Sequence, residues 1–403
     1  MLQPRAGYGG NCRGNVTLIA AVAAIPMLLS AGAAIDYMRA SAITTSLQSA
    51  VDAAALGAAA ANTTNVSVKR KQATQFLHDT KDFAAVEPTV EFSGDMVTVT
   101  AVTDMPTSFI GLAGFKTLEI AVTATAVTVT KPVCILSLNE SADSAIAISG
   151  SSAHVDAKNC LVHSNSTSAK GMDNTSHTAS EAEGFCVAGG YSGSNYNPLP
   201  KTNCRKVVDP YAGLPQPSIS GCDFNNITLT TGTATLAPGV FCGGIIISNT
   251  ASISFAPGTY VLKNGPLSIN TSGTVIGSEV TFYFTGLQSI LKLTGSATVD
   301  LSAPKTGPYA GLVFVQNSGS PPDKSHKING HSDLKITGVG YFPKQQLSIG
   351  GSGNFGVASP FMTFVADTME FHGNGTLTMN LDPATAGYAV NLPRGFIGTR
   401  LTN

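Results

Sequence analysis

Side chains that could support catalysis are sparse in the C-terminal two thirds of this sequence. Cleavage of a glycosidic bond uses two carboxyl groups that face the scissile bond. We consider six scattered acids after Pro132 as candidates: Asp300, Asp323, Asp333, Asp367, Glu370 and Asp382. Among these six, Asp367 and Glu370 are the closest pair in sequence. On a strand, residues three apart point to opposite faces, so the spacing does not predict that these carboxylates act together. We interpret both as solvated residues at strand edges or corners, and we predict no catalytic residue.

The other patterns that signal chemistry are missing from the sequence. No Gly-x-Ser-x-Gly motif stands between a predicted strand and helix, as a nucleophile elbow requires. Gly350-Gly351-Ser352-Gly353 is glycine-rich, but no helix or lysine follows that could hold a phosphate, so we interpret it as a corner. The seven histidines are scattered and no Cys-x-x-Cys pair occurs, so we predict neither a metal site nor a cofactor.

The seven cysteines are divided unevenly by a hydrophobic segment. Cys12 precedes the segment, and the other six follow it. An even set on one side of a membrane is typical of an oxidising compartment, whereas a lone thiol suits the reducing side. We therefore expect Cys12 to stay reduced, with six unrelated free thiols as the alternative for the rest. The expected disulfides join neighbours: Cys134 with Cys160, Cys186 with Cys204, and Cys222 with Cys242.

That hydrophobic segment, residues 16–35, predicts a transmembrane helix. It is a run of twenty residues without a charge, and at ~1.5 Å per residue it spans ~30 Å, the thickness of a bilayer's hydrocarbon core. Arg5 and Arg13 precede the run, while Asp36 and Arg39 follow it and roughly cancel. The positive-inside rule therefore places the N-terminus in the cytoplasm and the rest of the chain outside.

The helix is predicted to continue beyond the membrane. Ile43, Leu47 and Val51 step by four along a strongly helix-forming stretch that reaches Asn62. A membrane helix that runs into an amphipathic stalk is the architecture of pilin-like subunits. The alternative to this stalk is an ordinary packed helix after an anchor, since periodicity does not separate the two. The alternative to the span is a cleaved signal peptide, with Ala31-Gly32-Ala33 as the cleavage site.

Short segments of this region carry a family resemblance. They are Arg13-Gly14-Asn15-Val16, Ile35-Asp36-Tyr37 and Leu47-Gln48-Ser49-Ala50-Val51-Asp52-Ala53-Ala54-Ala55-Leu56. Together with the apolar run, they resemble the N-terminal region of the TadE/TadG-like proteins of the Tad (tight-adherence, Flp pilus) system.

The resemblance is closer to TadG-like members than to processed pseudopilins. Processed Tad pseudopilins have a glutamate five residues after the cleaved glycine, whereas Ile19 lies at that distance from Gly14 here. TadG-like members also lack this glutamate. Its absence argues against cleavage by the peptidase and against assembly as a pilin-like subunit. Such members often carry a von Willebrand-type metal site, but its Asp-x-Ser-x-Ser motif is absent, so the downstream domain must be of another kind.

A small α+β unit is predicted after the long helix. Residues 66–83 favour a polar helix, and residues 89–92 and 96–102 favour a hairpin around Ser93-Gly94-Asp95. Apolar residues then alternate strictly from Leu118 to Ala126. Lys131-Pro132 marks the end of the unit, because proline restricts both its own backbone and that of the residue before it.

Beyond Pro132, irregular repetition predicts a parallel β-solenoid. Residues 235–240 recur nineteen residues later as residues 254–259, and small polar, glycine-containing units separate strand-like runs throughout. Rungs of ~20–25 residues with small corner residues are typical of a solenoid. A β-sandwich or jelly roll is the alternative. Residues 160–221 are rich in Ser, Asn, Gly and Pro, and we expect them to form long loops stapled to the first rungs.

The expected fold class is therefore a membrane-anchored, mainly β protein. The expected parts are a cytoplasmic N-terminus (1–15), a transmembrane helix (16–35), a helical stalk with a small TadE/G-like α+β unit (36–131) and an extracytoplasmic β-solenoid (132–403). With 12% charged residues and a net charge of −1, the chain has no nucleic-acid footprint.

The resemblance implies a structural or interaction role in Tad (Flp) pilus assembly or anchoring. The expected location is the bacterial inner membrane, with a single span and a C-terminal domain that is periplasmic or surface-exposed. The expected partners are inner-membrane lipid, components of the pilus machinery and glycans. The alternatives are a surface adhesin or glycan-binding protein and a carbohydrate-active enzyme. For the former, Tyr260, Tyr283, Tyr309 and Tyr341 are available for stacking, although such residues are more often core or rim residues than ligand contacts.

We expect the anchor to be retained, because the helix continues without a break through the cleavage-like Ala31-Gly32-Ala33. Sequencing of the mature N-terminus checks this. A mature chain that begins at Ala34, or directly after Gly14, would contradict it.

Overall fold

The computed structural model describes residues 13–61, 63, 65–330, 334–384 and 386–402, and the chain forms two compact units. The first comprises Met1–Val129 with Ile397–Asn403, and the second comprises Thr130–Phe396. The last residues were assigned to the solenoid by sequence, but they return to the first unit. There Leu401 packs against the core, and the Thr402 hydroxyl donates to the Thr125 carbonyl at 3.2 Å, 277 residues away.

The first unit is built on one long helix. Its elements are α1 (Arg13–Ala60), α2 (Val66–His78), the 3₁₀ turn η1 (Lys81–Phe83), β1 (Thr89–Ser93), β2 (Met96–Pro106), η2 (Ile110–Ala113) and the first part of β3 (Thr117–Ser137). The expected second helix is shorter than its pattern: α2 ends at His78, and Asp79 caps it. Among the described residues, α1 alone is long and apolar enough to cross a membrane.

The core of this unit lies between α1 and an antiparallel sheet. Leu47 and Val51 on α1 are fully buried, as their spacing predicts. They share one hydrophobic cluster with Val97 and Val99 of β2 and with Val122 of β3. β1 pairs with β2, and β2 pairs with β3 in register from its first residue to its last. The membrane-type helix therefore also serves as the core helix of the folded unit.

The second unit is the predicted parallel β-solenoid, with about ten turns. The strands after β3 are β4 (Ile146–Ser149), β5 (His154–Ser164), β6 (Met172–Asn174), β7 (Ser180–Val187), β8 (Tyr191–Ser192), β9 (Tyr196–Asn197), β10 (Phe224–Leu229), β11 (Thr233–Leu236), β12 (Gly239–Asn249), β13 (Ser252–Phe255), β14 (Gly258–Lys263), β15 (Leu267–Thr271), β16 (Thr274–Gly277), β17 (Val280–Thr285), β18 (Leu291–Gly295), β19 (Thr298–Ser302), β20 (Leu312–Gln316), β21 (Ser325–Gly330), β22 (Leu334–Gly351), β23 (Asn354–Phe355), β24 (Met362–Gly373), β25 (Thr376–Thr378) and β26 (Arg394–Thr402). The repeat seen in the sequence is one rung, because Thr235 of β11 lies opposite Ser254 of β13.

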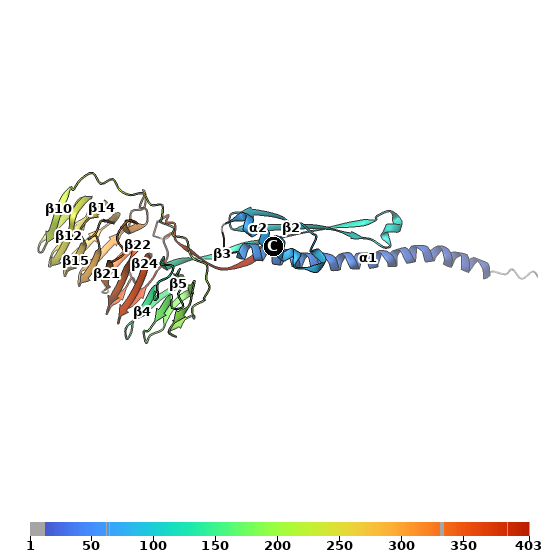
Figure 1. Ribbon diagram of the computed structural model, residues 1–403, viewed down its shortest axis with the longest axis horizontal. Coiled ribbons are helices and arrows are strands. Elements are labelled where there is room, and N and C mark those ends of the chain that lie inside the picture. The colour runs from blue at the N-terminus through green and yellow to red at the C-terminus, as the bar shows by residue number, and fades with distance from the viewer. Residues whose placement is uncertain (1–12, 62, 64, 331–333, 385, 403) are drawn as a thin grey trace, which may run out of the picture. The chain divides into compact units, whose positions relative to one another are not determined.

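The rungs do not stack in sequence order. The chain enters at β3, in the middle of the stack, and winds through β5 and β7 to β9 at one end. It restarts at β10 at the opposite end and winds back through β12, β14, β17, β20 and β22 to β24. There β24 pairs with β3 and β4, so the last long run of rungs docks on the first (Figure 1).

This docking, which we call the junction, joins residues more than 200 positions apart. Phe364 lies opposite Ile135, and the Ser137 hydroxyl donates to the Asp367 carbonyl at 2.7 Å. Gly150 and Gly373 stack at a shared corner with positive φ, where a Cβ on Gly150 would collide with the Gly373 backbone. Glycine is the residue that adopts this backbone without a steric penalty. Gly351 of the glycine-rich motif continues the same stack, so the motif is a corner, as predicted.

Aromatic rings fill the interior of the longer run. Phe241, Tyr260 and Phe282 follow one another from rung to rung, with ring centroids 5.7 and 5.4 Å apart. Phe314 and Phe342 extend the series at 5.9 and 6.4 Å. Such contacts add to the burial of large apolar surfaces. Register between rungs is therefore specified by packing as well as by hydrogen bonds.

Residues 198–223, which we call the strap, connect the two ends of the stack. The Lys201 amide donates to the Phe185 carbonyl near one end, Tyr309 Oη donates to the Pro215 carbonyl further along, and the strap then reaches β12. Because β7, β20 and β12 succeed one another along the stack, the strap runs beside the rungs from one end to the other. The expectation of long loops over residues 160–221 is therefore wrong for residues 160–197, which contain the end of β5 and the strands β6 to β9. It is correct for the strap.

Three disulfides form between the predicted neighbours. Cys134–Cys160 joins adjacent rungs, Cys186–Cys204 holds the beginning of the strap to β7, and Cys222–Cys242 holds its end to β12. Cys12 lies outside the described residues. Two of the three bridges therefore fix the strap at its two ends.

The segments that enter and leave the solenoid lie side by side. The Val133 amide donates to the Pro393 carbonyl at 2.8 Å. The Arg394 guanidinium donates to the Thr130 carbonyl at 3.0 Å and to its hydroxyl at 2.8 Å. Both ends of the second unit are consequently next to the junction rather than at the ends of the stack.

Replacing Cys222 and Cys242 by alanine should release the far end of the strap. The bridge closes a loop with a sequence separation of 20 residues. In the chain-entropy model, a loop of that size corresponds to about 3 kcal/mol of stability. We expect protease cleavage within residues 205–221 to accelerate in the C222A/C242A variant, as measured by limited proteolysis with mass spectrometry of the fragments.

The variant C134A/C160A is the matched control, because it also removes one bridge but leaves both strap bridges in place. Unchanged cleavage of the strap in C222A/C242A would contradict the prediction.

In the wild-type chain, alkylation before and after reduction should count one free thiol and then seven. Several free thiols before reduction would contradict the disulfide set.

Candidate functional site: a polar groove beneath the strap

A groove of about 670 Å³ lies between the strap and the junction. This volume falls in the range of ~300–1,000 Å³ that is usual for ligand sites. Three parts of the chain that are distant in sequence line it: the first rungs, the last rungs and the strap. The lining residues are Leu138, Asn139, Glu140, Ser141, Asn165, Lys206, Val207, Val208, Asp209, Ala212, Ser318, Tyr341, Pro343, Lys344 and Asp367.

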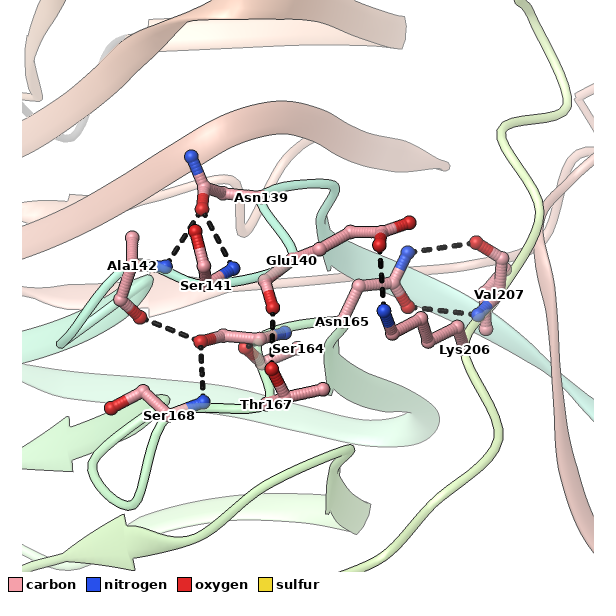
Figure 2. Close-up of polar contacts among 11 residues, drawn as sticks. Asn139, Glu140, Ser141, Ala142, Ser164, Asn165, Thr167, Ser168, Lys206 and Val207 are labelled. Carbon is pink, nitrogen blue, oxygen red and sulfur yellow. Dashed lines mark hydrogen bonds and ion pairs between the residues drawn. The ribbon is translucent and has the colours of Figure 1, made fainter.

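Asn139 shapes the floor of the groove at the junction. Its side-chain oxygen accepts hydrogen bonds from the amides of Ser141 (3.0 Å) and Ala142 (2.7 Å), which closes a tight turn after β3 (Figure 2). Its side-chain nitrogen donates to both carboxylate oxygens of Asp367 at 3.1 Å. The Asp367 carboxylate is thereby held in a fixed orientation at the groove.

Asn165 fixes the strap over the neighbouring rung. Its side-chain nitrogen donates to the Val207 carbonyl and its oxygen accepts from the Val207 amide, both at 2.8 Å (Figure 2). Asn165 is buried, and a buried amide that satisfies both partners specifies a single position for the strap. Beside it, Lys206 and Glu140 form an ion pair at 2.6 Å whose carboxylate is mostly exposed, so it contributes little to stability.

Tyr341 and Asp209 connect the strap to the longer run of rungs. The Tyr341 hydroxyl donates to the Asp209 carboxylate at 2.8 Å, and its ring meets Tyr211 edge-on at 5.3 Å. Burial, followed by the charge of Asp209, raises the pKa of Tyr341 well above its usual value. The phenol therefore stays protonated and remains a donor across the whole physiological range.

The charges of the groove are mixed rather than of one sign. Glu140, Asp209 and Asp367 supply carboxylates, and Lys206 and Lys344 supply ammonium groups. Within the described residues, no three His, Cys, Asp or Glu side chains cluster in a way that could hold a metal ion. The arrangement can donate and accept many hydrogen bonds, which suits a polar ligand such as a sugar.

The candidate residues from the sequence analysis do not come together at one site in the structure. Asp367 lines the groove, but Glu370 lies on the next part of β24, opposite Ser348 and Ala147, and is not among the lining residues. The six cysteines form the disulfides and also lie outside the lining. Tyr260, Tyr283, Tyr309 and Tyr341 are all buried, which agrees with their interpretation as core or rim residues rather than ligand contacts. Of the four, Tyr341 lines the groove.

Sequence reasoning missed the residues of the strap. Lys206 and Asp209 lie in a segment without periodicity, so no pattern assigned them a partner. One signal was available: Asn139 and Asn165 both follow a buried strand end, one rung apart, as the pairing of Ser137 with Ser164 shows. Treating residues 160–221 as loops hid this repetition.

Two histidines are buried in the solenoid without charge. Burial lowers the pKa of His163, which stands two residues before Asn165, to about 4. Burial also lowers the pKa of His326 to about 3, and its Nδ1 accepts the Leu291 amide proton at 3.0 Å. Both pKa values lie below the ordinary value of 6.5. Between pH 6.5 and each lowered pKa, the folded state therefore binds fewer protons than the unfolded state.

The free energy of unfolding of the wild-type protein should therefore fall as the pH drops from 6.5 toward 4. Each imidazole contributes about 1.4 kcal/mol per pH unit in that window, and the loss ends once the folded form is also protonated. The variant H163Q should show a shallower slope in urea unfolding measured across the window. The variant H326Q should also show a shallower slope, and slopes equal to that of the wild-type protein in both variants would contradict the assignment.

The fold and the groove define a class: a protein with a membrane-type N-terminal helix and a disulfide-bonded β-solenoid that carries a polar groove. Residues 14–61 match the family model described as Tad, putative Flp pilus-assembly TadE/G-like. The resemblance inferred from the short N-terminal segments is thereby confirmed for that region. Comparison with curated proteins gave no match, and comparison with solved structures gave none either.

Proposed function

We propose that this protein is a structural or interaction component of Tad (Flp) pilus assembly or anchoring at the bacterial envelope. The observation that carries the proposal is the match of residues 14–61 to the TadE/G-like family, which supports a pilus-related role. The matched segment makes up most of α1, the helix that is long and apolar enough to cross a membrane. The C-terminal half of α1 packs in the core of the first unit.

The proposed location is the inner membrane, with a single span and a cytoplasmic N-terminus. Arg5 and Arg13 before the apolar run favour this orientation. The three disulfides of the second unit are compatible with the oxidising side of the membrane, where the solenoid would be periplasmic or surface-exposed. Pilus machinery and membrane lipid are the proposed partners.

We further propose that the protein acts without catalysis. The support is that each carboxylate of the groove is held by a neighbouring side chain: Asp367 by Asn139, Asp209 by Tyr341 and Glu140 by Lys206. Glu370 is not among the lining residues. A second candidate function, as an adhesin that binds glycans, is favoured by one observation, the volume and mixed polarity of the groove.

Deletion of the gene in the native host tests the proposal. We expect loss of surface pili, counted by electron microscopy, and loss of surface adherence. The wild-type gene and the variant D367A/E370A should restore both equally, because the role does not require these carboxylates. The variant L47D, which places a charge in the core of the first unit, should fail to restore them and serves as the negative control.

Unchanged pili and adherence after deletion would contradict the pilus role. Retention of glycans by the purified full-length chain without product release would then favour the adhesin. Release of new reducing ends, lost in D367A/E370A with the fold intact, would contradict the absence of catalysis. Inner-membrane fractionation of a C-terminally tagged chain, with protease added to spheroplasts, checks location and orientation.

A further inference from the structure

The loop between β2 and β3, residues 107–116, exposes large apolar side chains along its length. Leu112 is 77% exposed, Phe115 is 68% exposed and Phe109 is 39% exposed. Leu118, two residues after the loop, is 43% exposed. Contiguous apolar side chains of this size mark a surface that contacts something other than water.

This loop packs against α1 inside its uncharged run. A Cβ on Gly32 would collide with the ring of Phe109, so the ring lies directly on the helix backbone at Gly32. Gly32 stands three residues before Ile35, the last residue of the run, which is ~4.5 Å along the helix axis. The loop therefore lies at the depth where the span that begins at Val16 leaves the hydrocarbon core.

Asp36 fastens the loop at this depth. Its carboxylate accepts hydrogen bonds from the amides of Ser108 (3.0 Å), Phe109 (2.7 Å) and Ile110 (2.9 Å). Arg39 donates to the Ser108 hydroxyl at 2.9 Å. The Asp36 side chain is fully buried by these contacts. A charge at the boundary of a bilayer is costly unless it is paired, and here three amides satisfy it.

The loop also satisfies much of its own backbone. The Thr107 amide donates to the Lys116 carbonyl at 3.1 Å, and its hydroxyl donates to the Phe115 carbonyl. The amides of Leu112 and Gly114 donate within the turn, each at 3.1 Å. A segment that enters lipid must satisfy its backbone groups internally, because the hydrocarbon offers no partners. Together with the hydrogen bonds to Asp36, these satisfy much of the loop backbone, which suits a position at the lipid surface, where headgroups and water can pair with the rest.

We propose that residues 107–116 insert into the lipid surface beside α1 and form a second membrane contact. Leu29 and Ile35 lie three residues on either side of Gly32, on the same helix face, and both are exposed. The apolar side chains of the loop extend this lipid-facing surface at the same level. Aromatic rings are typical of that level, and Lys116 at the edge of the loop suits contact with lipid phosphate. The inference rests on the membrane anchor of the proposed function.

Tryptophan fluorescence tests the proposal in the full chain, because the sequence contains no tryptophan. The variant L112W is reconstituted into phosphatidylcholine vesicles with or without brominated acyl chains, which quench fluorophores that touch them. The variant L28W reports the span itself, and M96W, at the opposite end of the β2–β3 ladder and 43% exposed, is the matched control. F115W repeats the test at a second position of the loop.

We expect brominated lipid to remove most of the emission of L112W and F115W, as of L28W, and to leave M96W unchanged. Unquenched, water-like emission from both loop variants while L28W is quenched would overturn the proposal and leave the anchor standing. Blue-shifted but unquenched emission would also overturn it, since a second copy of the chain would then cover the loop. Loss of quenching in L28W as well would show that the anchor itself is wrong, and the inference would fall with it.

Discussion

The pairing of β24 with β3 and β4 is the interaction on which the second unit depends. Without it, the molecule would contain two separate stacks of rungs, each with an open edge of unpaired backbone groups. With this pairing, one edge strand of each stack forms hydrogen bonds with the other, and the ladder of hydrogen bonds continues through the whole solenoid. The closure joins residues about 230 positions apart, so it forms at the cost of a large loop closure.

The groove is a consequence of this closure. Asn139 and Glu140 come from the first rungs, Asp367 comes from the last, and Lys206 and Asp209 come from the strap. These three segments would not meet if the rungs followed one another in sequence order. The strap must span the stack because the chain finishes one end of the solenoid and restarts at the other. Its two terminal disulfides then hold the roof of the groove in place.

Features with a local cause could be predicted from the sequence. The burial of Leu47 and Val51 followed from a spacing of four, and the nineteen-residue repeat gave the register of β11 on β13. The disulfides join cysteines only 18 to 26 residues apart, so pairing neighbours was sufficient. These patterns required no knowledge of distant parts of the chain.

Features with a distant cause could not be predicted. β7 carries Glu181 and Glu183 and reads as a loop, because its strand character depends on pairing with β5. The partner of Asp209 is 132 residues away, and the return of residues 397–403 to the first unit depends on contacts still more remote. Asp36 belonged to a recognisable motif, but its role as an acceptor for the β2–β3 loop needed the folded hairpin.

The side-by-side entry and exit of the solenoid determine how a pulling force would pass through it. Tension between Thr130 and Arg394 would act across one set of adjacent strands near the middle of the stack. The outer rungs on both sides lie outside this path, so they would carry no part of that load. A solenoid fed from its end would instead peel rung by rung. The permuted order of the rungs thus separates the part of the domain that bears force from the surfaces that it presents.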